Sequence, residues 1–307
     1  MTKTLDVKRI AIFLIIAFGV AWLGGLVIYL TGGLAKSPYT LLILAVVYMG
    51  APALAHILTR LITREGWQNI YLRPKLKWGW KYWLVCWITP GIVVVLGMAI
   101  YFALFPQFYD PTLSAVRKLL ERSAQGVPLP QINPWTVVIS QTMFAVLIAP
   151  ILNAIPVLGE EFGWRAYLQP KLMALGSRKA MGLIGVIWGV WHWPVILMGY
   201  EYGFNYPGAT WLGCIVFLWF TFVLATFLGW ATLRAGSVWP AVIGHGAING
   251  IAGIVVFFVQ GEPNPLLGPS VVGIIGSIGF AVVALLIFLR PGALDLPAST
   301  QTEAAKA

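Results

Sequence analysis

The chain has 307 residues, of which 59% are hydrophobic and only 10% are charged. Soluble domains carry about 25% charged residues, so this composition excludes a soluble globular protein and predicts an integral membrane protein in contact with lipid. The net charge of +10 does not indicate a nucleic-acid partner, because the basic residues follow the loops of a membrane protein. Cys86 and Cys214 both fall in apolar runs, which argues against a disulfide framework or a cysteine-based metal site.

Eight apolar stretches are each long enough for a helix to cross a bilayer. They cover residues 10–31, 40–63, 82–105, 135–158, 180–198, 210–233, 238–260 and 270–289. The first is expected to be retained, because it is about 20 residues long and no signal-peptide cleavage site of Ala-x-Ala type follows it. The fourth contains Pro150 and Pro156, which predict a kink. The fold class is therefore all-α, a polytopic membrane helix bundle with about eight transmembrane helices.

The lysine and arginine residues lie mostly in loops on one side of this layout. The exceptions are Lys36, Arg117, Lys118 and Arg122. Cytoplasmic loops are enriched in basic residues, so we expect a multi-pass protein with both termini in the cytoplasm, in the plasma membrane of a prokaryote. A layout with seven or nine spans would lose this asymmetry.

The longest external loop is predicted at residues 106–133. Asp110 and Pro111 have the pattern of an N-cap followed by a first-turn proline. A short helix on the outer surface would then place one apolar face against the membrane, formed by Leu113, Val116, Leu119 and Leu120. The polar, alanine-rich tail from Pro291 is predicted to be disordered.

The segment Gly159–Tyr167, GEEFGWRAY, places charge at the end of a long apolar run. A charged side chain in a membrane helix persists mainly where it is paired or functional. Glu161 and Arg165 are i,i+4 neighbours on a helix and are expected to pair. Glu160 is rotated about 100° from Glu161 around the helix, so we expect it to face a reaction centre.

Two of the three histidines also occur in distinctive apolar sequences. His192 lies in IWGVWHWP, and His245 lies in GHGAING with Asn249 one helical turn further on. The i,i+4 spacing puts His245 and Asn249 on one helix face, and the glycines at 244, 246 and 250 allow another helix to approach closely. His56 has no motif around it and is expected to bond or pack between helices.

These polar groups suit peptide hydrolysis. A carboxylate shielded from bulk water can act as general base on a water molecule that an imidazole holds. A second imidazole and a carboxamide can donate hydrogen bonds to the oxyanion that forms. Two histidines and a glutamate could instead bind zinc, although the His-Glu-x-x-His signature of metalloproteases is absent. For Glu160 to meet His192, the fourth span must lie deeper than the apolar boundaries indicate, or the fifth must begin earlier, near Lys171.

GEEFGWR resembles the Glu-Glu-x-x-x-Arg motif of the CPBP family of intramembrane proteases. This family groups CAAX prenyl endopeptidases, bacteriocin-processing enzymes, Abi proteins and lysostaphin resistance proteins. Trp188 to His192 resembles its Phe-x-x-x-His motif, and His245 to Asn249 its His-x-x-x-Asn motif, in the family's order. Trp188 stands where the family usually has Phe, which we expect to alter packing beside His192 without removing chemistry.

The resemblance implies a CAAX-type intramembrane endopeptidase, of glutamate type or metal-dependent. Glu160 would activate water with help from His192, His245 and Asn249 would form the oxyanion hole, and Glu161 and Arg165 would support them. No cofactor is required and no metal ligand is assigned; a metal-dependent enzyme would use Glu160, His192 and His245. The expected substrate is a peptide or membrane-associated protein.

The predicted organisation has three parts. Residues 1–134 hold three transmembrane helices and the external loop, residues 135–260 the catalytic core, and residues 261–307 the last transmembrane helix and the tail. Two other functions fit the same fold. One is a non-proteolytic family member acting as a bacteriocin-immunity or membrane scaffold protein. The other is a transporter with a proton relay, which the near absence of acidic residues in the external half disfavours.

Overall fold

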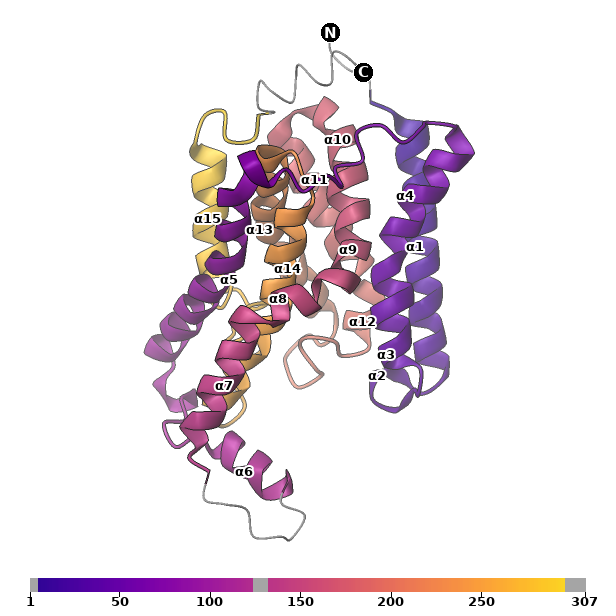
Figure 1. Ribbon diagram of the computed structural model, residues 1–307. Helices are drawn as coiled ribbons and strands as arrows, with labels where there is room; N and C mark the ends of the chain where they lie inside the picture. The colour runs from indigo at the N-terminus through magenta and orange to yellow at the C-terminus, as the bar shows by residue number, and fades with distance from the viewer. Residues whose placement is uncertain (1–4, 124–131, 296–307) are drawn as a thin grey trace.

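A computed structural model describes residues 5–123 and 132–295 as a bundle of helices (Figure 1). Within these residues no β-strand forms beyond one isolated bridge between Tyr109 and Val259. The all-α membrane bundle predicted from the sequence is therefore confirmed.

Five helices in the described part of the chain are long and apolar enough to cross a membrane. They are α1 (Val7–Leu30), the helix Thr40–Thr63 that ends in α4 (Met49–Thr63), α5 (Leu76–Leu104), α13 (Trp211–Ala235), and Trp239–Phe258, which begins with α14 (Trp239–Ile251). They correspond to the first, second, third, sixth and seventh predicted spans.

The other three predicted spans are broken or short. The fourth is divided into α7 (Pro134–Leu147), α8 (Ala149–Leu152) and α9 (Ala154–Gly163). The fifth is divided at His192 into α11 (Ser177–Trp191) and α12 (Trp193–Leu197), and only α15 (Ile278–Leu289) is helical in the eighth. Proline lacks the amide hydrogen of a helix interior and favours first-turn positions, and Pro150 and Pro194 stand at the start of α8 and α12.

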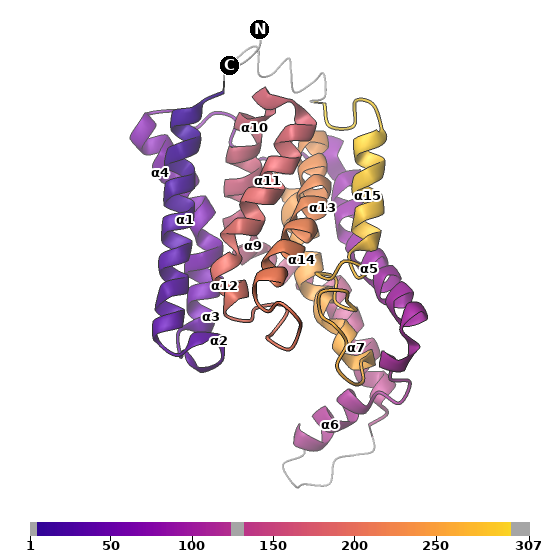
Figure 2. The same cartoon turned by 180° about the vertical axis from the view of Figure 1, so that it is seen from behind.

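Helices α13 and α14 form the centre of the bundle. The buried share of the apolar window is 72% in α13 but only 33% in α1 and 28% in α5, so the outer helices present their side chains to lipid. Helix α14 packs against α5, α8, α9 and α13, and α4 packs between α1 and α9. Figure 2 shows the pair α1 and α4 on one side of the bundle and α5 and α15 on the other.

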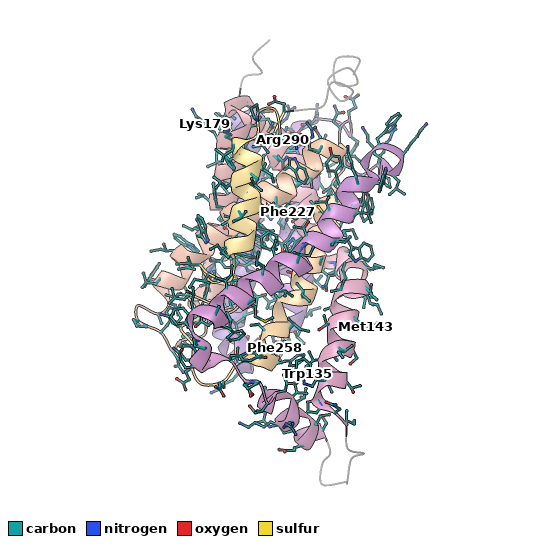
Figure 3. All side chains as sticks on the ribbon, turned by 90° about the vertical axis from the view of Figure 1, so that its left-hand side faces the viewer. Trp135, Met143, Lys179, Phe227, Phe258 and Arg290 are labelled. Carbon is teal, nitrogen blue, oxygen red and sulfur yellow. The ribbon has the colours of Figure 1, made fainter. Side chains whose placement is uncertain are left out.

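Helix α1 begins and helix α15 ends at the same end of the bundle, where the chain also turns after α4 and after α10 (Gln169–Leu172) (Figure 1). We call this the basic end, because Arg73, Lys171, Lys179 and Arg290 lie in these turns and helix ends. Figure 3 shows Lys179 and Arg290 at this end and Trp135 and Phe258 towards the other. The gathering of basic residues at one end of the bundle is what the distribution of lysine and arginine among the loops predicts.

The expected surface helix is present as α6 (Ser114–Ser123), but its start was predicted wrongly. Asp110 is not the residue that directly precedes the helix, and Pro111 is not in its first turn. The Asp110 carboxylate instead accepts the amide hydrogens of Thr112 at 2.8 Å and Ser114 at 2.6 Å, so it caps the helix across a turn. Leu113 and Val116 of the predicted apolar face are buried against Val138 of α7, so this part of the face packs on the protein and not on the membrane, whereas Leu119 is exposed. Residues 296–307 of the predicted disordered tail lie outside the described residues.

Candidate active site

Two glycines hold the segment GEEFG directly against α4. A Cβ atom on Gly159 would lie 2.5 Å from the carbonyl oxygen of Met49, and one on Gly163 would overlap both the side chain and the backbone of Pro52. Such distances are far below van der Waals contact, so only glycine allows the backbones of α9 and α4 to approach this closely. The glutamates are thereby carried on a helix whose position is fixed by main-chain contact.

His56 of α4 fixes the same helix by a hydrogen bond. Its Nδ1 atom lies 2.8 Å from the carbonyl oxygen of Phe162, and its Nε2 atom lies 2.7 Å from Nε of Arg60. The carbonyl can only accept and the guanidinium can only donate, so His56 is a neutral ring protonated at Nδ1. The prediction of a helix-bonding histidine is confirmed.

The contiguous helix from Ala154 to Leu172, which begins with α9 and ends with α10, carries the two glutamates, and we call it the motif helix. Glu65, just after α4, anchors its far end at the basic end of the bundle. Its carboxylate lies 2.6 Å from Nζ of Lys171 and accepts a hydrogen bond of 2.9 Å from the Tyr167 hydroxyl. Burial alone would raise the pKa of Glu65, but the hydrogen bond and charge of Lys171 outweigh it and lower the pKa. Since α9 continues without a break to the end of α10, the motif is attached to α4 at both ends.

Glu161 and Arg165 form the predicted pair inside the bundle. Nη1 of Arg165 donates to Oε1 of Glu161 at 3.1 Å, and both side chains are fully buried. The same Oε1 lies 2.8 Å from Nδ1 of His245 on α14. One carboxylate thus holds both a guanidinium and an imidazole, and it joins α14 to the motif helix.

Glu160 is almost fully buried, with 3% of its surface exposed. Its Oε2 atom accepts a hydrogen bond of 2.8 Å from the indole nitrogen of Trp188 on α11. Within the described part of the chain, Oε1 of Glu160 has no hydrogen-bond partner. This oxygen is not completely sealed from solvent. Glu160 therefore keeps one oxygen available for a ligand, whereas Glu161 is engaged by the Arg165 guanidinium and the His245 imidazole.

His192 lies at the break between α11 and α12. Its Nδ1 atom donates to the backbone carbonyl of Trp188 at 2.8 Å, which leaves the lone pair of Nε2 free. The ring centroid of Trp188 lies 5.9 Å from that of His192 and 5.3 Å from that of His245. The structure thus gathers Glu160, His192 and His245 around one indole ring.

For Glu160 to meet His192, the sequence required either a deeper fourth span or a fifth span that begins near Lys171. The structure agrees with the first. Glu160 is 12 residues from the end of α10, which is about 18 Å of helix. His192 is 15 residues from the start of α11, about 22 Å. The motif helix extends further towards the basic end than the apolar boundary indicates, so Glu160 lies deep. Helix α11 begins at Ser177, not near Lys171.

Asn249 is not brought into this group. Its side chain is exposed on α14, and no hydrogen bond to Glu160, His192 or His245 forms in the described residues. The glycines beside it act as predicted, because Gly246 and Gly250 bring α14 into close contact with Pro150 and Ala149.

The residues do not form a ready metal site. Among residues 5–123 and 132–295, no three His, Cys, Asp or Glu side chains are arranged to hold a metal ion. Both histidines are nevertheless oriented through Nδ1 as metal-binding or water-binding histidines usually are, by a carboxylate for His245 and a backbone carbonyl for His192.

Sequence reasoning missed the hydrogen bond from Trp188 to Glu160, because it treated Trp188 only as a packing change. A signal was available. Trp188 lies one helical turn before His192 on the same face, and a buried indole nitrogen usually finds an acceptor. The roles of Gly159 and Gly163 were also missed, although two small residues four apart on a membrane helix indicate close helix contact.

Comparisons with known proteins match the segment in which the three motifs lie. Residues 138–251 match the sequence model of the Rce1-like family, described as type II CAAX prenyl endopeptidase Rce1-like. Over 93 residues the chain is 32% identical to the CAAX prenyl protease 2 of Methanococcus maripaludis, an alignment that covers 29% of this chain and 34% of that relative. The chain thus spans about a third of the length of this curated relative. The matched segment contains Glu160, Glu161, Arg165, Trp188, His192, His245 and Asn249. Residues 138–251 are therefore similar to the Rce1-like family, and the resemblance stated from the sequence is confirmed for this segment.

Proposed function

We propose that this protein is an intramembrane endopeptidase of glutamate type, which hydrolyses a peptide bond of a membrane-associated protein or peptide. The observation that supports this most directly is the state of Glu160. It is a buried carboxylate with one oxygen held by Trp188 and the other unpartnered, beside two oriented imidazoles. A general base must be kept from bulk water and must have a free oxygen for the proton it accepts.

In the proposed reaction, Glu160 takes a proton from a water molecule, and the water oxygen forms a bond to the carbonyl carbon of the peptide. The second O–H of that water stays intact and donates a hydrogen bond to Nε2 of His192, whose Nδ1 donates to the Trp188 carbonyl. The carbonyl π electrons move to the oxygen and give a tetrahedral oxyanion. The protonated Glu160 then donates to the amide nitrogen, the C–N bond breaks, and the amine leaves.

His245 and Asn249 are the proposed oxyanion donors. A neutral His245 with hydrogen on Nδ1 could only accept through Nε2, so donation requires the doubly protonated ring. The Glu161 carboxylate, 2.8 Å from Nδ1, stabilises that positive charge. Asn249 has no hydrogen-bond partner in the described part of the chain, so its amide is free to turn towards a bound substrate.

A prenylated C-terminus is the first substrate class to test. The family description and the name of the archaeal relative both refer to CAAX prenyl substrates. In such substrates a lipid on the cysteine would anchor the peptide at the membrane surface. The basic end is proposed to be cytoplasmic, with the site opening towards that side.

The test uses the purified full chain in detergent with two fluorescence-quenched peptides of the same sequence, one farnesylated on its CAAX cysteine and one unmodified, and a digest of membrane proteins read by mass spectrometry. The wild type should cleave at least one of these probes. Glu160→Gln should lose cleavage, and Glu121→Gln, on the exposed side of α6, should retain it.

No cleavage of any probe by the wild type, or equal cleavage by Glu160→Gln, would contradict the proposal. The non-proteolytic immunity or scaffold function would then be the better account.

A further inference from the structure

Trp188 contacts four ionisable residues of the site, Glu160, Arg165, His192 and His245. Its indole nitrogen donates to Glu160, and its ring centroid lies 4.4 Å from the guanidinium carbon of Arg165. Its ring meets His245 edge to face, and its carbonyl oxygen accepts from His192. The residue is only 2% exposed, so these contacts are not shared with solvent.

The hydrogen bond from the Trp188 indole to Oε2 determines that Oε1 is the free oxygen of Glu160. A glutamate side chain rotates about three bonds, and in the described structure the indole hydrogen is the one hydrogen bond that restrains this carboxylate. With Oε2 held at 2.8 Å, the carboxylate has a fixed orientation and Oε1 remains for another group. Catalytic groups need support of this kind, because a loosely held base loses much of its effect.

The face of the Trp188 indole ring also contacts Arg165. Nη2 of the buried Arg165 has no hydrogen-bond partner among the described residues. The ring lies over the guanidinium and attracts its charge through its π electrons, for which tryptophan is the most favourable aromatic residue. Arg165 in turn holds Glu161, so the same ring restrains the two adjacent glutamates by different means.

We propose that Trp188 is a positioning residue for Glu160, whose indole hydrogen fixes Oε2 so that Oε1 faces the reacting water. This rests on the proposed endopeptidase function. A phenylalanine would fill most of the same space but has no hydrogen to donate. The chain therefore holds its proposed base by a bond that the usual family residue at this position cannot make.

The test distinguishes the effect of the indole N–H hydrogen bond of Trp188 from the effect of its ring packing. In Trp188→Phe we expect kcat to fall by about tenfold or more, since hydrogen bonds to charged groups are strong enough for such an effect. KM should stay within about twofold, because the substrate is not contacted. Replacement of Trp188 by benzothienylalanine, which keeps the bicyclic ring but has sulfur in place of N–H, should give the same loss of kcat with a thermal midpoint close to wild type.

Trp191→Phe is the matched control. Trp191 is also fully buried and its indole nitrogen donates, but to the carbonyl oxygen of Ala17 on α1. We expect this variant to keep kcat within about twofold. In a Glu160→Asp background, whose shorter side chain does not reach the indole, Trp188→Phe should cost less than about twofold.

Trp188 has no positioning role if the benzothienylalanine protein has wild-type kcat, or if Trp188→Phe and Trp191→Phe are equally impaired. These outcomes differ from a failure of the proposed function, in which Glu160→Gln itself remains as active as wild type. The benzothienylalanine protein also decides the question should Trp188→Phe fail to fold.

Discussion

Nδ1 of His245 lies 2.8 Å from Oε1 of Glu161, and this contact joins the central helix α14 to the motif helix α9. The same oxygen accepts from Arg165, so the Glu161 charge is compensated within the bundle. Two glutamates adjacent in sequence therefore have different environments. Glu161 is bound by a guanidinium and an imidazole, and Glu160 has one tryptophan donor and a free oxygen. This difference is the structural basis for assigning the proton transfer to Glu160.

Glu161→Gln should destabilise the protein strongly. The change removes the carboxylate that is paired with the fully buried Arg165, and breaking a buried ion pair costs about 3–5 kcal/mol. The midpoint of thermal unfolding in detergent, followed by circular dichroism, should fall well below that of wild type, and cleavage should fall with it. Glu160→Gln is the matched control and should unfold close to wild type. Equal midpoints for wild type and Glu161→Gln would contradict the structural role of this ion pair.

Gly163→Ala tests the contact between α9 and α4. The added methyl would overlap Pro52, so the helices must separate, and such overpacking typically costs about 1–3 kcal/mol. Because the shift also moves the glutamates, cleavage should fall by at least about tenfold. Gly19→Ala adds the same methyl where no atom lies within 4 Å, and it should leave stability and cleavage unchanged or slightly improved. The same loss in both variants would point to a general effect of alanine on helix insertion.

The sequence predicts the class of fold and the helices that bear the site, because long apolar runs and i,i+4 spacing depend only on local geometry. It predicts the pair of Glu161 with Arg165 for the same reason. Contacts between segments far apart in the chain were not predictable. The bonds of His245 to Glu161 and of Trp188 to Glu160 depend on how α9, α11 and α14 turn about their axes.

The predicted boundaries of the fourth transmembrane span were wrong for a related reason. Residues 135–158 form one apolar run, but the helix is interrupted at Ile148 and at Asn153. After Asn153 it continues well past the charged motif. Hydropathy reports where lipid ends along a straight helix. It does not report that a buried pair such as Glu161 and Arg165 can lie within the protein, at a depth where apolar residues are expected.

Removal of metal ions distinguishes the two catalytic types. No three suitable side chains converge on one point in the described part of the chain, so we expect activity to survive EDTA and 1,10-phenanthroline. The purified protein should contain much less than one equivalent of zinc by elemental analysis. Loss of cleavage with chelator and recovery with added zinc would instead support a metal-dependent enzyme that uses Glu160, His192 and His245 after rearrangement.

Asp110 predicts an acid-sensitive segment outside the membrane. Burial alone would raise the pKa of this carboxyl group, but hydrogen bonds from Ser114 and Thr112 lower it from 3.8 to about 2. A carboxylate with a lowered pKa stabilises the folded state above its unfolded pKa, and this contribution is lost as the pH falls from about 4 to about 2. Hydrogen exchange at the first turn of α6, measured by mass spectrometry, should therefore lose protection over this range once intrinsic exchange rates are corrected for pH.

Asp110→Ala should remove both the protection and its pH dependence. Loss of a helix cap costs about 0.5–2 kcal/mol, so the first turn of α6 should exchange faster at neutral pH, and its protection should change little on acidification. Glu121→Ala, on the exposed face of the same helix, serves as the control and should keep the wild-type profile. A wild-type profile in Asp110→Ala would mean that packing of Leu113 and Val116 against Val138 holds the helix without the cap. Because the site lies in α9, α11 and α14, Asp110→Ala should leave cleavage unchanged, which separates the stability of the α6 segment from catalysis.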